Sequence, residues 1–158
     1  MATAGRLIIV CGLPGAGKTT LARRLAAETG ATRFCPDEWM DAFSLDPFDE
    51  PRRAAIETLQ WQLAQNILAL GGTAIIEWGT WGRSERDTLR NGARALGAGV
   101  ELHYLDLPLP ELYDRIRARN YEAPLITLEQ LQAWSQSFQH PTPEELALYD
   151  PPLEAPVP

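Results

Sequence analysis

The sequence has little of what marks secreted, metal-rich or membrane-spanning proteins. Its two cysteines, Cys11 and Cys35, are too few for a disulfide framework or a zinc site, and we expect both to be reduced and buried. The two histidines, His103 and His140, lack companion ligands and are interpreted as structural. No apolar run approaches the length of a membrane span, and no secretory cleavage pattern follows Met1. We therefore expect a cytoplasmic protein with no membrane partner.

Basic residues are in the minority. The chain has 158 residues, of which 21 are acidic and 14 basic, so its formal net charge is −7. A protein whose main partner is a long nucleic acid needs a broad basic face, so we expect a small-molecule partner instead. The length predicts one domain over 1–149, as a monomer or homodimer. The remaining residues, 150–158, include four prolines and are expected to be extended or disordered.

The stretch Gly12–Thr20 carries the phosphate-binding pattern G-x-x-x-x-G-K-[ST]. A short apolar run precedes it and helix-forming residues follow it, as in a strand, a loop and a helix. Glycines let successive backbone N–H groups turn toward one anion, and the helix N-terminus adds partial positive charge. We expect Lys18 to reach the β- and γ-phosphates of ATP and the Thr19 hydroxyl to bind Mg²⁺. The predicted nucleotide-binding residues are Gly12, Leu13, Pro14, Gly15, Ala16, Gly17, Lys18, Thr19 and Thr20.

Strands alternate with helical segments along the chain. The predicted strands cover Arg6–Cys11, Thr32–Cys35, Thr73–Trp78 and Gly99–Leu105. This alternation implies right-handed crossovers and a parallel sheet with helices on both faces, in a three-layer α/β arrangement.

Several helices have clear signals. A surface loop is expected over Ser44–Pro51, and a long amphipathic helix over Arg52–Leu70. The residues expected to form its apolar face are Ile56, Leu59, Leu63, Ile67 and Leu70. Pro110 is expected to open a helix that runs to about Arg119. Two further helix starts have the spacing of a capping box, namely Thr127 with Gln130 and Thr142 with Glu145.

Two classes of nucleotide-binding protein are disfavoured because their motifs are absent. GTP-binding switches usually carry an Asn-Lys-x-Asp segment, and this chain has none. Oligomeric ATPase motors usually close the third strand with an Asp-Glu pair, whereas a single acid, Glu77, closes it here. Phosphoryl transfer to an acceptor is the favoured chemistry.

Four segments together resemble the small P-loop kinases. They are Gly12–Thr20, Phe34–Glu38 with its aspartate, Glu77–Gly79 and Arg115–Asn120. Within that class the chain is similar to a group of predicted kinases, broadly described as AAA-type ATP-binding proteins. The group is related to the polynucleotide kinase 5′-kinase domain, chloramphenicol phosphotransferase, zeta toxins and gluconate kinases. The resemblance implies a P-loop NTPase fold with sheet order 2-3-1-4, an ATP site, and a hydroxyl acceptor over the ends of the second and third strands.

Asp37 is the candidate general base. A carboxylate after the second strand lies across the crevice from the phosphate loop, where a base could take the proton of an acceptor hydroxyl. In the kinases that the chain resembles, the matching aspartate has that role. The alternative is that Asp37 only caps the helix that starts there. Glu77 also has alternative roles: it could hold Mg²⁺ through water, bind an acceptor hydroxyl, or cap the next helix.

Arg115 and Arg119 are candidates for stabilising the transferred phosphoryl group. They lie four positions apart, on one helix face, at the start of a lid expected over about 119–128. Arg117 faces away from them. The alternative is a basic last turn that complements the helix dipole.

Three tryptophans fall on the expected acceptor side. Trp39 follows Asp37, and Trp78 and Trp81 follow Glu77, so their rings could form flat walls for an acceptor. Packing in the core is the alternative, and it is the interpretation for Trp61 and Trp134.

The sequence therefore predicts an enzyme that uses ATP and Mg²⁺ to phosphorylate a hydroxyl of a small molecule. The catalytic candidates are Lys18, Asp37, Arg115 and Arg119. Those for the acceptor are Asp37, Trp39, Glu77, Trp78 and Trp81, and those for the metal are Thr19 and Glu77. Two alternatives stay open, a kinase acting on a nucleoside or polynucleotide 5′-hydroxyl and an ATP-binding switch without an acceptor.

Overall fold

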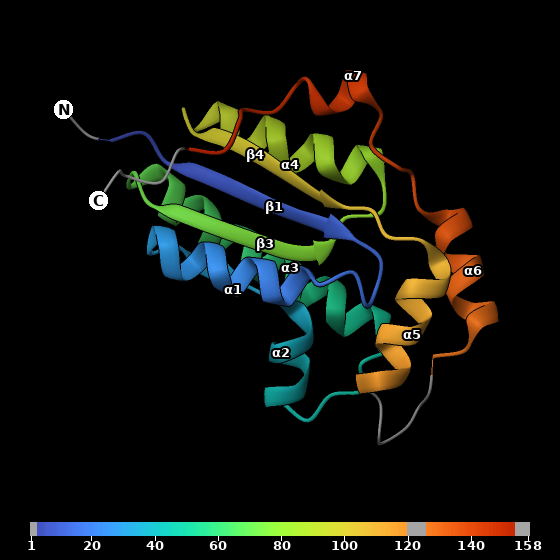
Figure 1. The fold of residues 1–158 in the computed structure, drawn as a ribbon. Helices are drawn as coiled ribbons and strands as arrows, with labels where there is room; N and C mark the ends of the chain where they lie inside the picture. The colour runs from blue at the N-terminus through green and yellow to red at the C-terminus, as the bar shows by residue number, and fades with distance from the viewer. Residues whose placement is uncertain (1–2, 120–125, 154–158) are drawn as a thin grey trace.

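A computed structural model describes residues 3–119 and 126–153. Within these residues the strands form one parallel sheet of order β2-β3-β1-β4 (Figure 1). Its strands are β1 (Arg6–Gly12), β2 (Thr32–Phe34), β3 (Thr73–Gly79) and β4 (Gly99–Leu105). The predicted strand order 2-3-1-4 is confirmed, and each strand lies within one residue of its predicted bounds.

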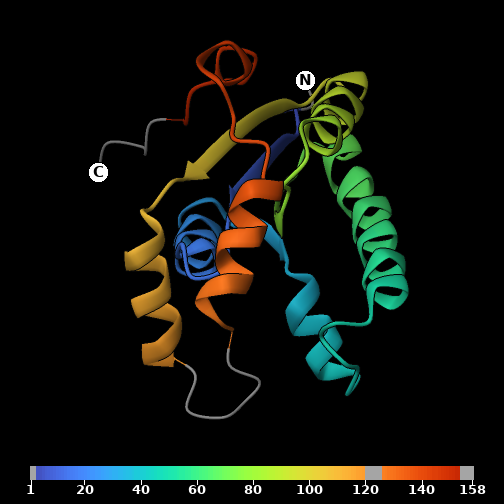
Figure 2. The same ribbon diagram turned by 90° about the vertical axis from the view of Figure 1, so that its right-hand side faces the viewer.

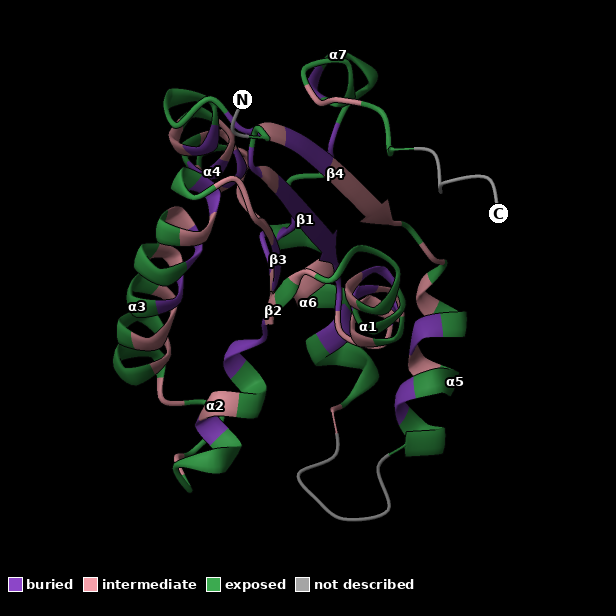
Figure 3. Ribbon diagram, turned by 90° about the vertical axis from the view of Figure 1, so that its left-hand side faces the viewer, coloured by how far each residue is buried: buried purple, intermediate pink, exposed green. Residues whose placement is uncertain are grey.

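Helices cover both faces of the sheet, as predicted (Figure 3). The helices are α1 (Lys18–Thr29), α2 (Pro36–Ala42), α3 (Glu50–Ala69), α4 (Arg83–Ala95), α5 (Leu109–Arg119), α6 (Leu128–Ser137) and α7 (Pro143–Leu146). On one face, α3 and α4 pack over Leu7 and Ile9 of β1, and on the other α1 packs over Ile8 and Val10. The central strand is thus buried on both sides, which explains its unbroken apolar run.

A third apolar cluster lies beyond the strand ends, where α5 and α6 pack side by side (Figure 2). Leu13 and Ala16 of the phosphate loop belong to it, together with Leu112 and Ile116 of α5. Burial of a side chain such as Leu112 contributes about 1.5–3 kcal/mol. The phosphate loop is therefore anchored by packing on α5.

The predicted apolar face of α3 is confirmed in part: Ile56 and Ile67 are half-buried, and Ile67 packs against the core, but the three leucines are wrong. Leu59, Leu63 and Leu70 are exposed, and the buried residues of the helix are Gln60, Ala64 and Leu68. Gln60 is accepted in the core because its Oε1 receives a hydrogen bond from the Trp78 indole at 2.8 Å. The helix also begins before the predicted Arg52, because the Asp49 side chain caps it by accepting from the Arg52 N–H and Pro51 lies in its first turn.

The chain after α6 is tied back to the sheet by polar contacts. The capping box at Thr127 is confirmed, with both of its hydrogen bonds present. At Thr142 only half of the box forms, because the Glu145 carboxylate binds Arg86 instead. Asp150, the first residue of the predicted tail, donates its N–H to the carbonyl of Val100 in β4 at 2.7 Å. Residues 154–158 of that tail lie outside the described residues.

In the described ranges, no helix is both long enough and apolar enough to cross a membrane.

Candidate active site

The phosphate loop is shaped by two glycines with left-handed backbone. Gly15 has φ 84° and Gly17, which caps α1, has φ 94°. A side chain on Gly15 would also come within 2.8 Å of Ile116. Only glycine combines this backbone with so close an approach of α5. The loop has the conformation in which backbone N–H groups can converge on an anion.

Lys18 lies at the floor of this loop. Its Nζ donates to the carbonyl of Leu13 at 3.0 Å, so the ammonium group curls back over the loop. Burial lowers the Lys18 pKa, while the negative charge of Asp37 acts in the opposite direction. The side chain is thus a half-buried cation whose hydrogen-bond acceptor is a carbonyl, and an anion in the loop would be a better partner.

Thr19 and Glu77 are joined by a hydrogen bond. The Thr19 hydroxyl donates to Glu77 Oε1 at 2.9 Å, and Arg33 from β2 donates to the same oxygen at 3.0 Å. Glu77 Oε2 is buried and has no partner among the described residues. A buried carboxylate oxygen without a partner is costly, and a hydrated cation next to Thr19 would satisfy it.

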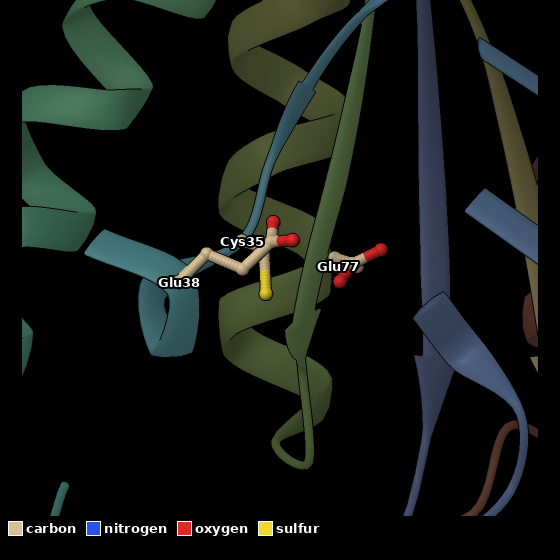
Figure 4. Close-up of side chains that lie close together, drawn as sticks. All are labelled: Cys35, Glu38 and Glu77. Atoms are coloured by element: carbon tan, nitrogen blue, oxygen red, sulfur yellow. The ribbon is translucent and has the colours of Figure 1, made fainter. Parts of the chain in front are cut away.

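Glu77 also lies close to two residues that follow β2, Cys35 and Glu38 (Figure 4). Their ligand atoms are all within 4.8 Å of one another. Arg33 already supplies positive charge there, since it contacts Glu38 at 2.6 Å as well as Glu77. Burial raises the pKa of the Cys35 thiol to about 12, so it stays protonated. This cluster is therefore an ion-pair network that positions Glu77.

Asp37 stands in the first turn of α2, one residue after Pro36. Its side chain is 69% exposed, and Oδ1 is engaged by the Arg53 guanidinium of α3. The N-cap position of the helix belongs to Cys35, so Asp37 is free of the capping role that was its alternative. Arg53 fixes the carboxylate at the mouth of a cleft.

That cleft has a volume of about 570 Å³ and lies between the phosphate loop, α3, the β3–α4 connection and α6. Six predicted site residues line it, namely Pro14, Lys18, Asp37, Glu77, Trp78 and Trp81. Trp134, which the sequence assigned to packing, lines it too, with its ring centroid 5.9 Å from that of Trp81. Trp39 does not line the cleft but packs against Phe34.

The two candidate arginines of α5 are both exposed. Arg115 donates to Glu111 at 3.1 Å, and its Nη1 comes within 3.6 Å of where a Gly17 side chain would begin. It therefore overhangs the phosphate loop. Arg119 is the last residue of α5. Most of the predicted lid, residues 120–125, lies outside the described residues. Arg117 stacks instead on the ring of Tyr113.

Three arginines that shape the site were missed by the sequence analysis. Arg33 orients Glu77, Arg53 orients Asp37, and Arg86 holds the β3–α4 connection by donating to the carbonyl of Thr80 at 2.7 Å. A charged residue within a strand was a usable signal for Arg33. Arg53 and Arg86 carried no such signal, since the carboxylates that they bind, Asp37 and Glu145, lie 16 and 59 positions away.

Comparison with known proteins agrees with this geometry. A family model described as "AAA domain" matches residues 7–141. The chain belongs to this AAA-domain family. No match was found among the curated proteins.

Solved structures similar to this AAA-domain protein include a gluconokinase from Sinorhizobium meliloti 1021, with 19% identity and a TM-score of 0.62 over 90% of this chain and 78% of that one. A chain of the Pnkp1/Rnl/Hen1 RNA repair complex has 21% identity and a TM-score of 0.74 over 95% of this chain, which spans about half, 48%, of it. Kti12 from Chaetomium thermophilum, in complex with ADP-AlF3, has 18% identity and a TM-score of 0.65 over 87% of this chain and 82% of that one. The predicted P-loop kinase-like group is confirmed, and at these identities the likeness is one of fold.

Proposed function

We propose that this AAA-domain protein is a phosphotransferase that moves the γ-phosphoryl group of ATP to a hydroxyl of a small molecule. The observation that carries the proposal is that Lys18 and Asp37 line the same cleft from different elements. One belongs to the phosphate loop and the other follows β2, so a nucleotide and an acceptor would meet between them. A nucleotide switch has no need for a carboxylate in that position.

The residues present fit ATP with Mg²⁺. Lys18 would exchange the Leu13 carbonyl for the β- and γ-phosphates, and the Thr19 hydroxyl with Glu77 Oε2 would hold the hydrated ion. When bound, Mg²⁺ neutralises charge on the phosphates. Arg33 holds Glu77 in place from the opposite side.

Asp37 would accept the proton of the acceptor hydroxyl. Arg53 engages Oδ1, so Oδ2 is the oxygen that would take the proton. Arg115 overhangs the loop and, with Arg119, would stabilise charge on the phosphoryl oxygens, an effect on the order of a thousandfold in rate for such arginines. The many carboxylates that line the cleft suit a small acceptor better than a polynucleotide, whose phosphates they would repel.

A screen tests this proposal. The protein is incubated with MgATP and a library of hydroxyl compounds, and ADP release that depends on the compound is measured. Lys18→Ala serves as the inactive control, because its loss removes the point charge beside the phosphates. Acceptor-dependent ADP release that Lys18→Ala abolishes supports the proposal. Nucleotide binding without release for any hydroxyl compound would favour a switch.

A further inference from the structure

The end of the cleft that α3 and α4 form is rich in carboxylates. Beyond Asp37 it is lined by Glu50 and Glu57 of α3 and Glu85 of α4. Arg53 lies among them and pairs with Asp37 and, through a longer contact of 3.9 Å, with Glu57, so one cation faces four carboxylates. Within the described residues, Glu50 and Glu85 make no ion pair at all. This end of the cleft therefore carries a net negative charge, and an anionic acceptor would be repelled.

These carboxylates are held where ionisation is unfavourable. Burial, reinforced by the charge of Glu85, raises the pKa of Glu57 to about 7. Burial also raises the Glu85 pKa. A cation between the two groups would offset both effects, because it favours the ionised form of each.

Aromatic rings line the same cleft as these carboxylates. Trp78 lies near the end of β3, and Trp81 follows in the β3–α4 connection. Both line the cleft together with Trp134. A cation over a tryptophan face is stabilised by the ring's quadrupole, by about 0.5–2 kcal/mol. Carboxylates and tryptophan rings that line one cleft are the combination of side chains that suits an organic cation.

Thr80 points independently to a ligand. The residue is 1% exposed, and its hydroxyl has no hydrogen-bond partner among the described residues. Its backbone has φ 46°, which is unfavourable for a β-branched side chain. An unpartnered buried hydroxyl and a strained backbone together are a stability cost at a cleft wall, and a ligand hydroxyl or amine would satisfy the first of them.

We propose that the acceptor is a cationic amino alcohol or amino sugar, whose protonated amine lies between Glu57 and Glu85 against Trp78 and Trp81. The transfer step rests on the proposed function. The amine end would direct a hydroxyl of the same molecule toward Asp37. As that oxygen bonds to the γ-phosphorus, the bond from phosphorus to the β–γ bridging oxygen breaks. ADP leaves with the electron pair, and Asp37 takes the hydroxyl proton.

Calorimetry with MgADP present tests the binding of the amine without requiring turnover. The probes are a panel of amino alcohols and amino sugars, each paired with its N-acetyl derivative, which keeps the hydroxyls and loses the charge. For the compounds that bind, we expect the amine to bind at least about tenfold more tightly than its N-acetyl partner. The preference should weaken with added salt and disappear in Glu57→Gln/Glu85→Gln.

A double variant with the same charge change provides the control. Glu28 near the end of α1 and Glu144 in α7 are outside the cleft, so Glu28→Gln/Glu144→Gln should keep the amine preference. Equal or tighter binding of the N-acetyl compounds, an amine preference that survives Glu57→Gln/Glu85→Gln, or no binding by any pair would overturn the inference. Glu-dependent amine binding without ADP release from MgATP would leave the amine site standing and remove the proposed kinase activity.

Discussion

Asp37 is the residue at which base catalysis and a structural role can be separated. Asp37→Asn keeps the shape of the side chain and a hydrogen-bonding oxygen for Arg53, but it can no longer take up a proton. We expect turnover with an acceptor from the screen to fall by about a hundredfold or more, with ATP affinity little changed. Steady-state kinetics with a coupled ADP assay measures both.

Asp41 offers a matched control for that variant. It lies on the same short helix, is exposed, and does not line the cleft. Asp41→Asn should therefore leave turnover unchanged. Near-normal turnover in a folded Asp37→Asn protein would remove the base assignment and make Glu77 the next candidate.

Glu57 should make stability depend on pH. Its pKa is raised in the folded protein from an ordinary value of 4.5 to about 7, so the unfolded chain ionises first as pH rises. Stability is therefore lost between about pH 4.5 and 7. Glu57→Gln cannot ionise, so it should be more stable than the natural chain by roughly 1 to 3 kcal/mol at pH 8 and by nearly nothing at pH 4.

Urea unfolding at several pH values checks this prediction. Glu28→Gln, which changes a glutamate that is 56% exposed, should show no such pH-dependent gain. A Glu57→Gln variant less stable than the natural chain at pH 8 would mean that Arg53 stabilises the ionised carboxylate more than burial opposes it.

Thr80 should separate stability from ligand binding. Thr80→Val retains the shape of the side chain and removes a buried hydroxyl that has no partner among the described residues. We expect the free energy of unfolding to stay level or rise by up to about 1 kcal/mol, while the acceptor KM rises. A loss of stability beyond about 1 kcal/mol would show that the hydroxyl has a structural partner.

Sequence motifs identified single residues well where local backbone chemistry determines their role. Gly15, Gly17 and Lys18 act through the loop that contains them, so an eight-residue pattern was enough to predict them. Arg33 and Arg53 act through carboxylates on other elements, and their function exists only once β2, β3, α2 and α3 have assembled. Trp39 was predicted to face an acceptor and packs against Phe34 instead, because adjacency to Asp37 in sequence does not fix the direction of a helical side chain.

At the scale of elements, the Arg86–Glu145 pair links α4 to α7. Both side chains are nearly inaccessible, with Arg86 Nε 2.6 Å from Glu145 Oε1, and Arg86 also donates to the carbonyls of Thr80 and Gln139. Removing one partner leaves the other charge buried, which typically costs about 3–5 kcal/mol. We expect Glu145→Gln to lower the free energy of unfolding toward that range, as measured in urea.

Two further variants qualify that expectation. Arg24→Met removes one partner of an exposed pair within α1, and it should cost less than about 1 kcal/mol. Arg86→Met/Glu145→Leu removes both buried charges and should recover part of the loss. If Glu145→Gln costs no more than Arg24→Met, the buried pair is not what fastens α7 to α4.

For helix α3, the sequence predicted the helix but not the side that faces the core. Its existence and length followed from helical spacing, but the leucines at that spacing face outward. The core-facing side is chosen by contacts with β3 and α4, including the Gln60–Trp78 hydrogen bond and the packing of Trp61 on Gly92. One sequence does not contain those contacts in any local pattern.

For the whole molecule, the strand order was predictable because a resemblance supplied the topology, while the apolar runs placed each strand. The acceptor cleft was not, because it is formed by α3, α6 and the β3–α4 connection, which are distant in sequence. Its charge depends on which side chains these elements turn inward. For this reason the sequence predicted that the acceptor has a hydroxyl, but it did not predict the charge of the acceptor.

The whole fold should be stabilised by nucleotide. Because the phosphate loop is packed on α5 and bonded through Thr19 to β3, its occupation is linked to global unfolding. At a nucleotide concentration 100 times Kd, binding adds about 2.7 kcal/mol, which corresponds to roughly 5 to 10 °C in Tm for a chain of this size. We expect thermal unfolding to show this shift with MgADP, and Lys18→Ala to reduce it. Part of the rise in Tm should depend on Mg²⁺ and be lost on chelation. Glu77→Gln should remove only that part, since Lys18 still holds the phosphates. An MgADP shift that chelation leaves intact in the natural chain would exclude Thr19 and Glu77 as the metal site while retaining the nucleotide site.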